Sequence, residues 1–133
     1  MKPKKGQSVE ISVDSLVFGG DGIGQMDGFK IFVEGARQED LLTFLNALRR
    51  IGGEYEVADN GISFWRERPL TGIEFETDMH PGFMTDWHQP FVALLTQARG
   101  VSVVHETIYE DRFAYVRDLN AMGANIKVFS RND

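Results

Sequence analysis

Apolar and polar residues alternate in the first quarter of the chain. Three short apolar runs lie at 9–13, 16–18 and 29–33, and glycine-rich stretches separate the second from the third. A period of two with glycine turns predicts three strands forming an N-terminal hairpin or three-strand segment. The glycine cluster at 19–24 departs from the dinucleotide-binding pattern, because Gln25 replaces its third glycine, so turn geometry is the preferred interpretation.

From Gln38 the apolar positions recur at helical spacing, which predicts a helix that ends at Gly52. The later patterns predict a hairpin around Asn60 and Gly61, strands at 73–77, 101–109 and 125–129, and helices ending near Arg99 and spanning 113–122. The order from Lys30 is therefore β-α-β-β-β-α-β-α-β. This alternation is typical of an α/β fold with helices packed on an open sheet.

The second predicted helix has two alternative starts. Asp86 with Gln89 matches a capping box, whereas Pro90 is typical of a first helical position and moves the start to Gln89. Both alternatives keep Asp86 near a helix N-terminus, where an aspartate usually caps the backbone N–H groups. Trp87 and Phe91 are expected in the core.

Composition restricts the classes of function. The chain has no cysteine, which excludes a disulfide framework and a thiolate nucleophile, and its three histidines lack the i, i+4 spacing of a helical zinc pair. Residues 1–30 have no net charge, so residues 31–133 carry the whole net charge of −6 and argue against a broad nucleic-acid surface. No apolar run is long enough to cross a bilayer or to form a secretory signal, which predicts a cytoplasmic location.

Several motifs occur together in the larger part of the chain. They are residues 31–40 (IFVEGARQED), 44–53 (FLNALRRIGG), 80–87 (HPGFMTDW), 105–113 (HETIYEDRF) and 122–124 (MGA). In this order and spacing they resemble the enolpyruvyl transferase family, in its branch of UDP-N-acetylglucosamine 1-carboxyvinyltransferases. The resemblance covers residues 31–133 and identifies them as part of such a domain.

The family resemblance implies a fold of repeated βαβαββ units, of which this chain supplies about one and a half. It also implies transfer of the enolpyruvyl group of phosphoenolpyruvate to the 3-hydroxyl of UDP-N-acetylglucosamine, in peptidoglycan precursor synthesis. No metal or organic cofactor is implied. The family's lysine–asparagine pair, acid-bearing loop and later arginine have no counterpart in the chain. We therefore expect it to be inactive without the remainder of the transferase.

The same resemblance assigns roles to five residues. Asp86 matches the aspartate at the sugar hydroxyl, the proposed general base, which must lie within hydrogen-bond reach of that hydroxyl. Arg112 matches an arginine near the catalytic aspartate, and Ile108 matches a position beside the nucleotide. His80 and Thr85 belong to the same motif and are expected to shape the sugar site. Without the resemblance, Arg112 would be interpreted as a solvated surface arginine.

Residues 1–35 resemble a different family. The segments 6–11 (GQSVEI), 16–24 (LVFGGDGIG) and 27–29 (DGF) are similar to the opening of a TRAM domain, a small RNA-binding β-barrel. The predicted division is therefore an incomplete TRAM-like segment at 1–30 followed by the transferase part at 31–133, which is the pattern of a chimera. Two alternative functions follow, namely weak RNA binding through Lys2, Lys4 and Lys5, and a folded chimera without evolved activity that pairs through sheet edges as a homodimer.

Overall fold

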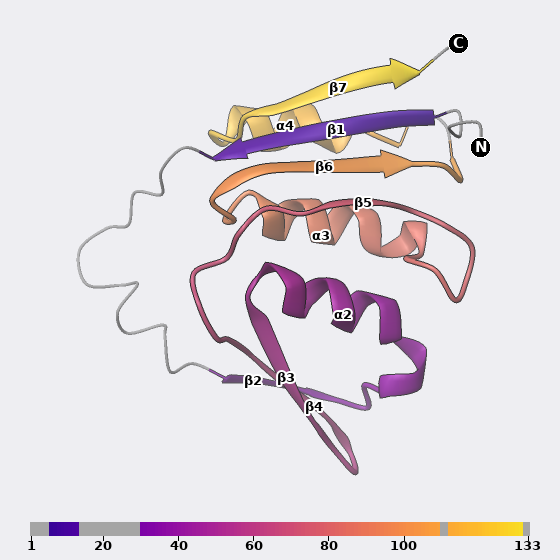
Figure 1. Ribbon diagram of the computed structural model, residues 1–133, viewed down its shortest axis with the longest axis vertical. Coiled ribbons are helices and arrows are strands. Elements are labelled where there is room, and N and C mark those ends of the chain that lie inside the picture. The colour runs from indigo at the N-terminus through magenta and orange to yellow at the C-terminus, as the bar shows by residue number, and fades with distance from the viewer. Residues whose placement is uncertain (1–5, 14–29, 110–111, 132–133) are drawn as a thin grey trace.

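A computed structural model describes residues 6–13, 30–109 and 112–131, which form two sheets and three α-helices (Figure 1). The strands are β1 (Gly6–Val13), β2 (Lys30–Glu34), β3 (Gly53–Ala58), β4 (Gly61–Arg66), β5 (Glu74–Glu76), β6 (Gly100–Glu106) and β7 (Ile126–Arg131). The helices are α2 (Leu42–Ile51), α3 (His88–Leu95) and α4 (Tyr115–Ala121), with 3₁₀ turns η1 (Gln38–Asp40) and η2 (Thr85–Trp87). The element order predicted from Lys30 onward is confirmed. The predicted strand at 16–18 and the glycine cluster at 19–24 lie outside the described residues.

The larger sheet has the strand order β5-β6-β1-β7. Strands β5 and β6 are parallel, while β1 is antiparallel to both of its neighbours. In this register Ile11 lies opposite Ser102 on one side and Ile126 on the other, and Gly6 lies opposite Arg131. The N-terminal strand is thus a central strand of the sheet that also contains β6 and β7. The last of the three strands predicted in the N-terminal segment, at 29–33, corresponds to β2 and lies in the other sheet, so β1 and β2 are not neighbours.

The smaller sheet is antiparallel, with the order β2-β4-β3. The predicted hairpin is confirmed, with β3 and β4 joined at the turn before Gly61. Helix α2 covers this sheet through Leu45, which packs with Tyr55 and Ile62 in a small apolar cluster. Every residue of β2 is exposed, so this edge strand contributes little to that cluster.

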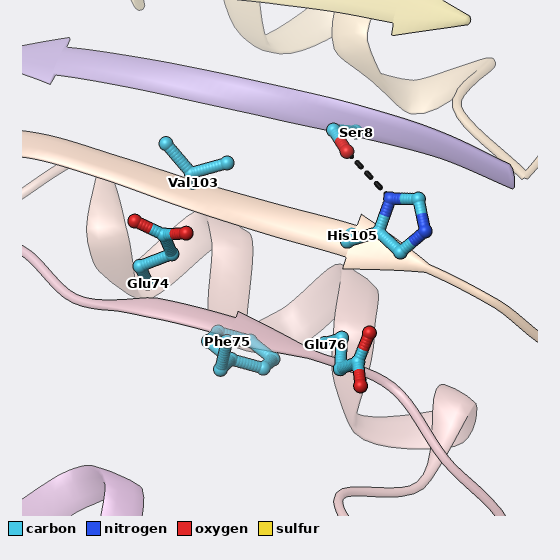
Figure 2. Close-up of a pocket in the computed structure, with 6 residues that line it drawn as sticks. All are labelled: Ser8, Glu74, Phe75, Glu76, Val103 and His105. Carbon is cyan, nitrogen blue, oxygen red and sulfur yellow. Dashed lines mark hydrogen bonds between the residues drawn. The ribbon is translucent and has the colours of Figure 1, made fainter. Parts of the chain in front are cut away.

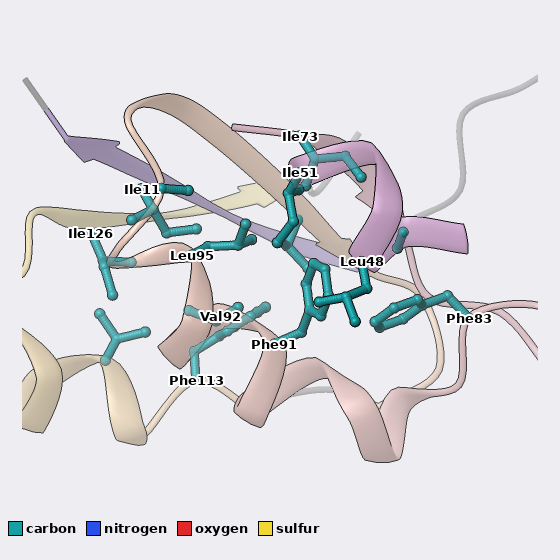
Figure 3. Close-up of a cluster of buried hydrophobic side chains, with 14 residues drawn as sticks. Ile11, Leu48, Ile51, Ile73, Phe83, Phe91, Val92, Leu95, Phe113 and Ile126 are labelled. Atoms are coloured by element: carbon teal, nitrogen blue, oxygen red, sulfur yellow. The ribbon is translucent and has the colours of Figure 1, made fainter. Parts of the chain in front are cut away.

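The main core lies between the larger sheet and the helices (Figure 3). The side chains of Ile11, Phe91, Val92, Leu95 and Val104 are at most 1% exposed. Helix α2 adds Ala47, Leu48 and Ile51 to the same cluster, so this helix has apolar contacts with both parts of the fold. The prediction that Phe91 belongs to the core is confirmed, and Trp87 packs against this cluster partly buried.

Local contacts explain where the boundaries differ from those predicted. Helix α2 begins at Leu42 rather than at Gln38 because Leu41 leaves helical geometry, and it ends at Ile51, capped by Gly52, whose φ of 119° is left-handed. Helix α3 ends at Leu95, short of the predicted Arg99, in a turn in which the Thr96 hydroxyl donates to a carbonyl. In the described part of the chain, no helix has the length and apolarity to span a membrane.

Candidate functional site

A shallow pocket of about 260 Å³ lies where β5 and β6 end. It is lined by Asp78, Met79, His80, Met84, Thr85, Asp86, Ile108 and Tyr109. Residues 78–80 follow β5, residues 108 and 109 follow β6, and the remainder come from the approach to α3. Ligand sites in open α/β sheets commonly occupy the carboxyl ends of parallel strands, where successive loops meet.

The structure brings four of the five predicted site residues to this pocket. Asp86, Thr85, His80 and Ile108 all line it, although the first three lie between β5 and α3 and Ile108 lies between β6 and α4. The fifth residue, Arg112, lies at the rim. Its guanidinium group stacks 4.3 Å from the centre of the Tyr109 ring, which lines the pocket.

Asp86 lies in η2, immediately before α3, and its side chain is exposed. The expected helix cap is not formed: Met84 and Trp87 occupy the N-cap positions of η2 and α3, and neither end has a side-chain cap hydrogen bond. The capping box with Gln89 is therefore wrong. Within the described residues the Asp86 carboxylate has no hydrogen-bond or ion-pair partner, so both of its oxygens can accept from a ligand.

Aromatic packing fixes the segment that carries Asp86. The rings of Phe83 and Trp87, on either side of it, are 5.3 Å apart between centroids. Phe83 also lies 4.4 Å from Phe75 of β5, and Trp87 lies 5.8 Å from Phe44 of α2. Because both flanking rings are held by other elements, the exposed carboxylate is presented from a rigid backbone.

Glu106, the last residue of β6, holds the wall of the pocket together from beneath. Its side chain is fully buried. One carboxylate oxygen, Oε1, accepts from the Thr85 hydroxyl at 2.8 Å, and the other, Oε2, accepts from the backbone N–H groups of Ile108 at 2.9 Å and Tyr109 at 3.1 Å. These bonds turn the chain away from the sheet, so β6 ends at Glu106 and not at the predicted Tyr109.

A buried hydrogen-bond chain extends from this carboxylate. His88 Nδ1 lies 2.7 Å from Glu106 Oε1, and His88 Nε2 lies 2.7 Å from the Tyr115 hydroxyl. Burial, together with the positive charge of Arg112, lowers the pKa of His88 despite the neighbouring carboxylate, so the imidazole is neutral at pH 7. Burial also raises the pKa of Tyr115. The neutral ring therefore donates from Nδ1 to Glu106 and accepts the Tyr115 proton at Nε2.

Glu106 itself is ionised. Burial alone would raise its pKa, but hydrogen bonds from His88, Thr85 and the two backbone amides outweigh that effect and hold the pKa below its ordinary value. The hydroxyl of buried Thr77 donates a further bond to Oε2 at 3.0 Å. The interior thus stabilises a negative charge directly beneath the site.

Sequence reasoning assigned no role to Glu106 or His88. A signal for Glu106 was present in the strand pattern. Ser102, Val104 and Glu106 share the inward face of β6, because alternate residues of a strand point to the same side. A charged residue on a buried face requires partners, and Thr85, from the separate motif at 80–87, is one of them.

The two shifted groups predict an acid-sensitive fold. Both His88 and Glu106 have a lower pKa in the folded protein than in the unfolded chain, so protons bind preferentially to the unfolded state. We expect the urea midpoint to fall as the pH drops below about 6.5, the ordinary imidazole value, and to fall again below about 4.3, the ordinary glutamate value. In His88→Gln, which cannot titrate, the upper decrease should disappear. Equal slopes between pH 7 and 5 in both proteins would contradict this assignment.

A second hollow, of about 280 Å³, lies on the outer face of the larger sheet (Figure 2). Ser8, Glu74, Glu76, Val103 and His105 line it together with Phe75, and Ser8 Oγ lies 2.6 Å from His105 Nδ1. None of the predicted site residues belongs to it. Across residues 6–13, 30–109 and 112–131, no group of three or more acidic or histidine side chains is arranged to hold a metal ion.

Comparison with known proteins agrees with the motifs around the first pocket. Residues 23–132 match the family model described as EPSP synthase (3-phosphoshikimate 1-carboxyvinyltransferase). The UDP-N-acetylglucosamine 1-carboxyvinyltransferase of Protochlamydia amoebophila is 58% identical over 101 residues, which is 75% of this chain and 22% of the relative. The corresponding protein of Chlamydia pneumoniae is 51% identical over 78% of this chain and 23% of its own length. UDP-N-acetylglucosamine 1-carboxyvinyltransferase 2 of Symbiobacterium thermophilum is 44% identical over 76% of this chain and 24% of its own length. The chain thus spans about a quarter of these relatives.

Proposed function

Because the chain belongs to the EPSP synthase family, we propose that the pocket at the ends of β5 and β6 is the sugar-nucleotide side of a carboxyvinyltransferase site. The proposed substrate is UDP-N-acetylglucosamine, the sugar nucleotide in the names of the relatives. The observation that carries this proposal is the exposed, unpartnered Asp86 carboxylate on a segment held by two anchored rings. An aspartate so placed serves neither the core nor a helix cap.

Asp86 is proposed as the group that accepts the proton of the sugar 3-hydroxyl. The hydroxyl oxygen adds to C2 of phosphoenolpyruvate while the methylene carbon takes a proton from an acid in the remainder of the transferase. The tetrahedral product then loses phosphate from C2 and a proton from the methyl carbon, which restores the double bond of the enolpyruvyl group. General-base assistance requires a carboxylate within hydrogen-bond reach of the hydroxyl on a positioned backbone, which η2 provides. Burial of the sugar by the remainder of the transferase would exclude water from this step.

The other predicted residues take distinct parts in this proposal. Ile108 and Tyr109 offer exposed apolar and aromatic surface to the nucleotide, and Arg112 lies at the same rim. Thr85 positions the site through its bond to Glu106, while His80 is exposed at the edge of the pocket. We expect no turnover from the chain alone, because the groups that would bind phosphoenolpyruvate are supplied by the remainder of the enzyme.

Titration with UDP-N-acetylglucosamine tests the proposal. We expect its addition to shift the amide resonances of Thr85, Asp86, Ile108 and Tyr109. In Asp86→Asn the affinity should fall about tenfold to a hundredfold, since a hydrogen bond to a charged group contributes about 1.5–3 kcal/mol. The matched control is Asp118→Asn, which removes an exposed carboxylate from α4 and should leave the affinity unchanged. Absence of shifts at the pocket, or equal affinity in Asp86→Asn, would contradict the proposal.

RNA binding by the first thirty residues stays a prediction. Lys2, Lys4 and Lys5 lie outside the described residues, and the described part of the TRAM-like segment is strand β1, which pairs with β6 and β7. The proposed boundary near residue 30 therefore divides the chain by the families that its two segments resemble. It does not divide the larger sheet, because β1 pairs with strands of the transferase part. Retention of labelled tRNA at low salt would support the RNA alternative.

A further inference from the structure

Helix α2 contacts a loop of the candidate site, although this helix covers the smaller sheet. The hydroxyl of Thr43, the second residue of α2, donates to the backbone carbonyl of Gly82 at 3.0 Å. The ring of the next residue, Phe44, has its centroid 6.5 Å from that of Phe83 and 5.8 Å from that of Trp87. The helix therefore holds the segment between β5 and α3 by a hydrogen bond as well as by aromatic packing.

The loop of residues 78–83 is closed by its own hydrogen bonds. The N–H of Asp78 donates to the carbonyl of Phe83 at 2.8 Å, and the N–H of Gly82 donates to the carbonyl of Met79 at 2.7 Å. The N–H of Met79 donates in turn to the Asp78 side chain at 2.8 Å. Because the two ends of a closed loop are joined, a bond to Gly82 from outside restrains the loop as a whole.

This loop contributes Asp78, Met79 and His80 to the lining of the pocket at the ends of β5 and β6. We propose that Thr43 is a positioning residue for this pocket, and that its hydroxyl fixes the loop in the conformation that binds the sugar nucleotide. Thr43 is not one of the residues that line the pocket, and it acts through the Gly82 carbonyl. The ligand named here rests on the proposed function.

The Thr43 bond serves the loop rather than its own helix. A threonine hydroxyl in a helix commonly bonds to a nearby carbonyl of the same helix. Thr96 does so at the end of α3, where its hydroxyl donates to the carbonyl of Ala93, three residues earlier. The Thr43 hydroxyl instead reaches a carbonyl 39 residues along the chain. Helix α2 has a separate source of stability, because its apolar face packs in both hydrophobic clusters.

Hydrogen exchange of the chain without ligand tests whether Thr43 fixes the loop. Thr43→Val keeps the branched shape but leaves the Gly82 carbonyl without its donor, so the N–H groups of Asp78 and Gly82 should exchange about threefold to tenfold faster. Thr43→Ser retains the hydroxyl and should exchange as the wild type does. The matched control is Thr96→Val, which removes the same kind of hydrogen bond from α3 and should leave both amides unchanged.

Titration with UDP-N-acetylglucosamine tests whether the fixed loop supports binding. The affinity should fall about threefold to tenfold in Thr43→Val and recover in Thr43→Ser, while Thr96→Val should bind as the wild type does. Unchanged exchange in Thr43→Val, faster exchange without a loss of affinity, or an equal loss of affinity in Thr96→Val would overturn the inference. If the wild type does not bind while Thr43→Val exchanges faster, the proposed function is overturned and the role of Thr43 in fixing the loop is upheld.

Discussion

Replacing Glu106 with glutamine is expected to lower the free energy of unfolding by about 3 kcal/mol, because breaking a buried charged network leaves its donors unsatisfied. Three hydroxyl or imidazole groups and two backbone N–H groups donate to this carboxylate. A glutamine side chain has one acceptor oxygen, and its NH₂ group is itself a donor that would face the donors previously bound by the second carboxylate oxygen. The N–H groups of Ile108 and Tyr109 should therefore exchange with solvent faster, and urea unfolding with amide hydrogen exchange measures both effects.

The matched control is Glu74→Gln, which removes the same charge from an exposed position on β5. Exposed substitutions away from special contacts usually change stability by less than about 0.5 kcal/mol. If Glu106→Gln behaves like this control, the carboxylate does not organise the pocket. If stability falls while the exchange of Ile108 and Tyr109 is unchanged, Glu106 supports the core without holding the wall.

Truncation of Ile11 to alanine is expected to cost about 3 kcal/mol, within the range for large-to-small changes in a packed core. The Ile11 side chain is 1% exposed and belongs to the same cluster as Val104 and Ile126. Stability is lost because the removed carbon atoms no longer gain free energy by leaving water for the core, and because their removal leaves a cavity. Thermal or chemical unfolding of the purified variant measures it directly.

Val101→Ala provides the comparison, since Val101 is 57% exposed on β6 and lies opposite Ser12 of β1. It should cost less than about 1 kcal/mol, the span of strand propensity. Equal, small effects of the two substitutions would mean that β1 does not occupy the sheet in solution. The first thirty residues would then form a segment separate from the transferase part, as their resemblance to a TRAM domain predicts.

The order of elements was predictable because periodicity is local. The apolar spacing of α2 and the turn before Gly61 each lie within a few residues of the element they define. Pairing between distant strands leaves no such local pattern. The alternation around Ile11 predicts a strand but does not indicate that this strand lies between β6 and β7, so its sheet and partners could not be assigned.

In the candidate site, too, the local motifs were predictable from the sequence and the contacts between distant residues were not. The motif around Asp86 and the motif around Ile108 were identified from sequence, and the structure places both at one pocket. The residues that hold the pocket were not assigned, because the role of a charged side chain depends on burial. Glu106 and His88 become recognisable as partners only when β6 and α3 lie side by side, with their side chains 2.7 Å apart.

The pairing of Gly6 with Arg131 places the start of β1 beside the end of β7. A short loop joining these residues, with the chain opened between Val13 and Lys30, would leave every strand pair of both sheets intact. In this circular permutant β1 would follow β7 as directly as β4 follows β3. The order of the strands along the polypeptide is thus independent of their order in the sheet. A strand encoded at the start of a gene can therefore complete a sheet whose other strands are encoded towards its end.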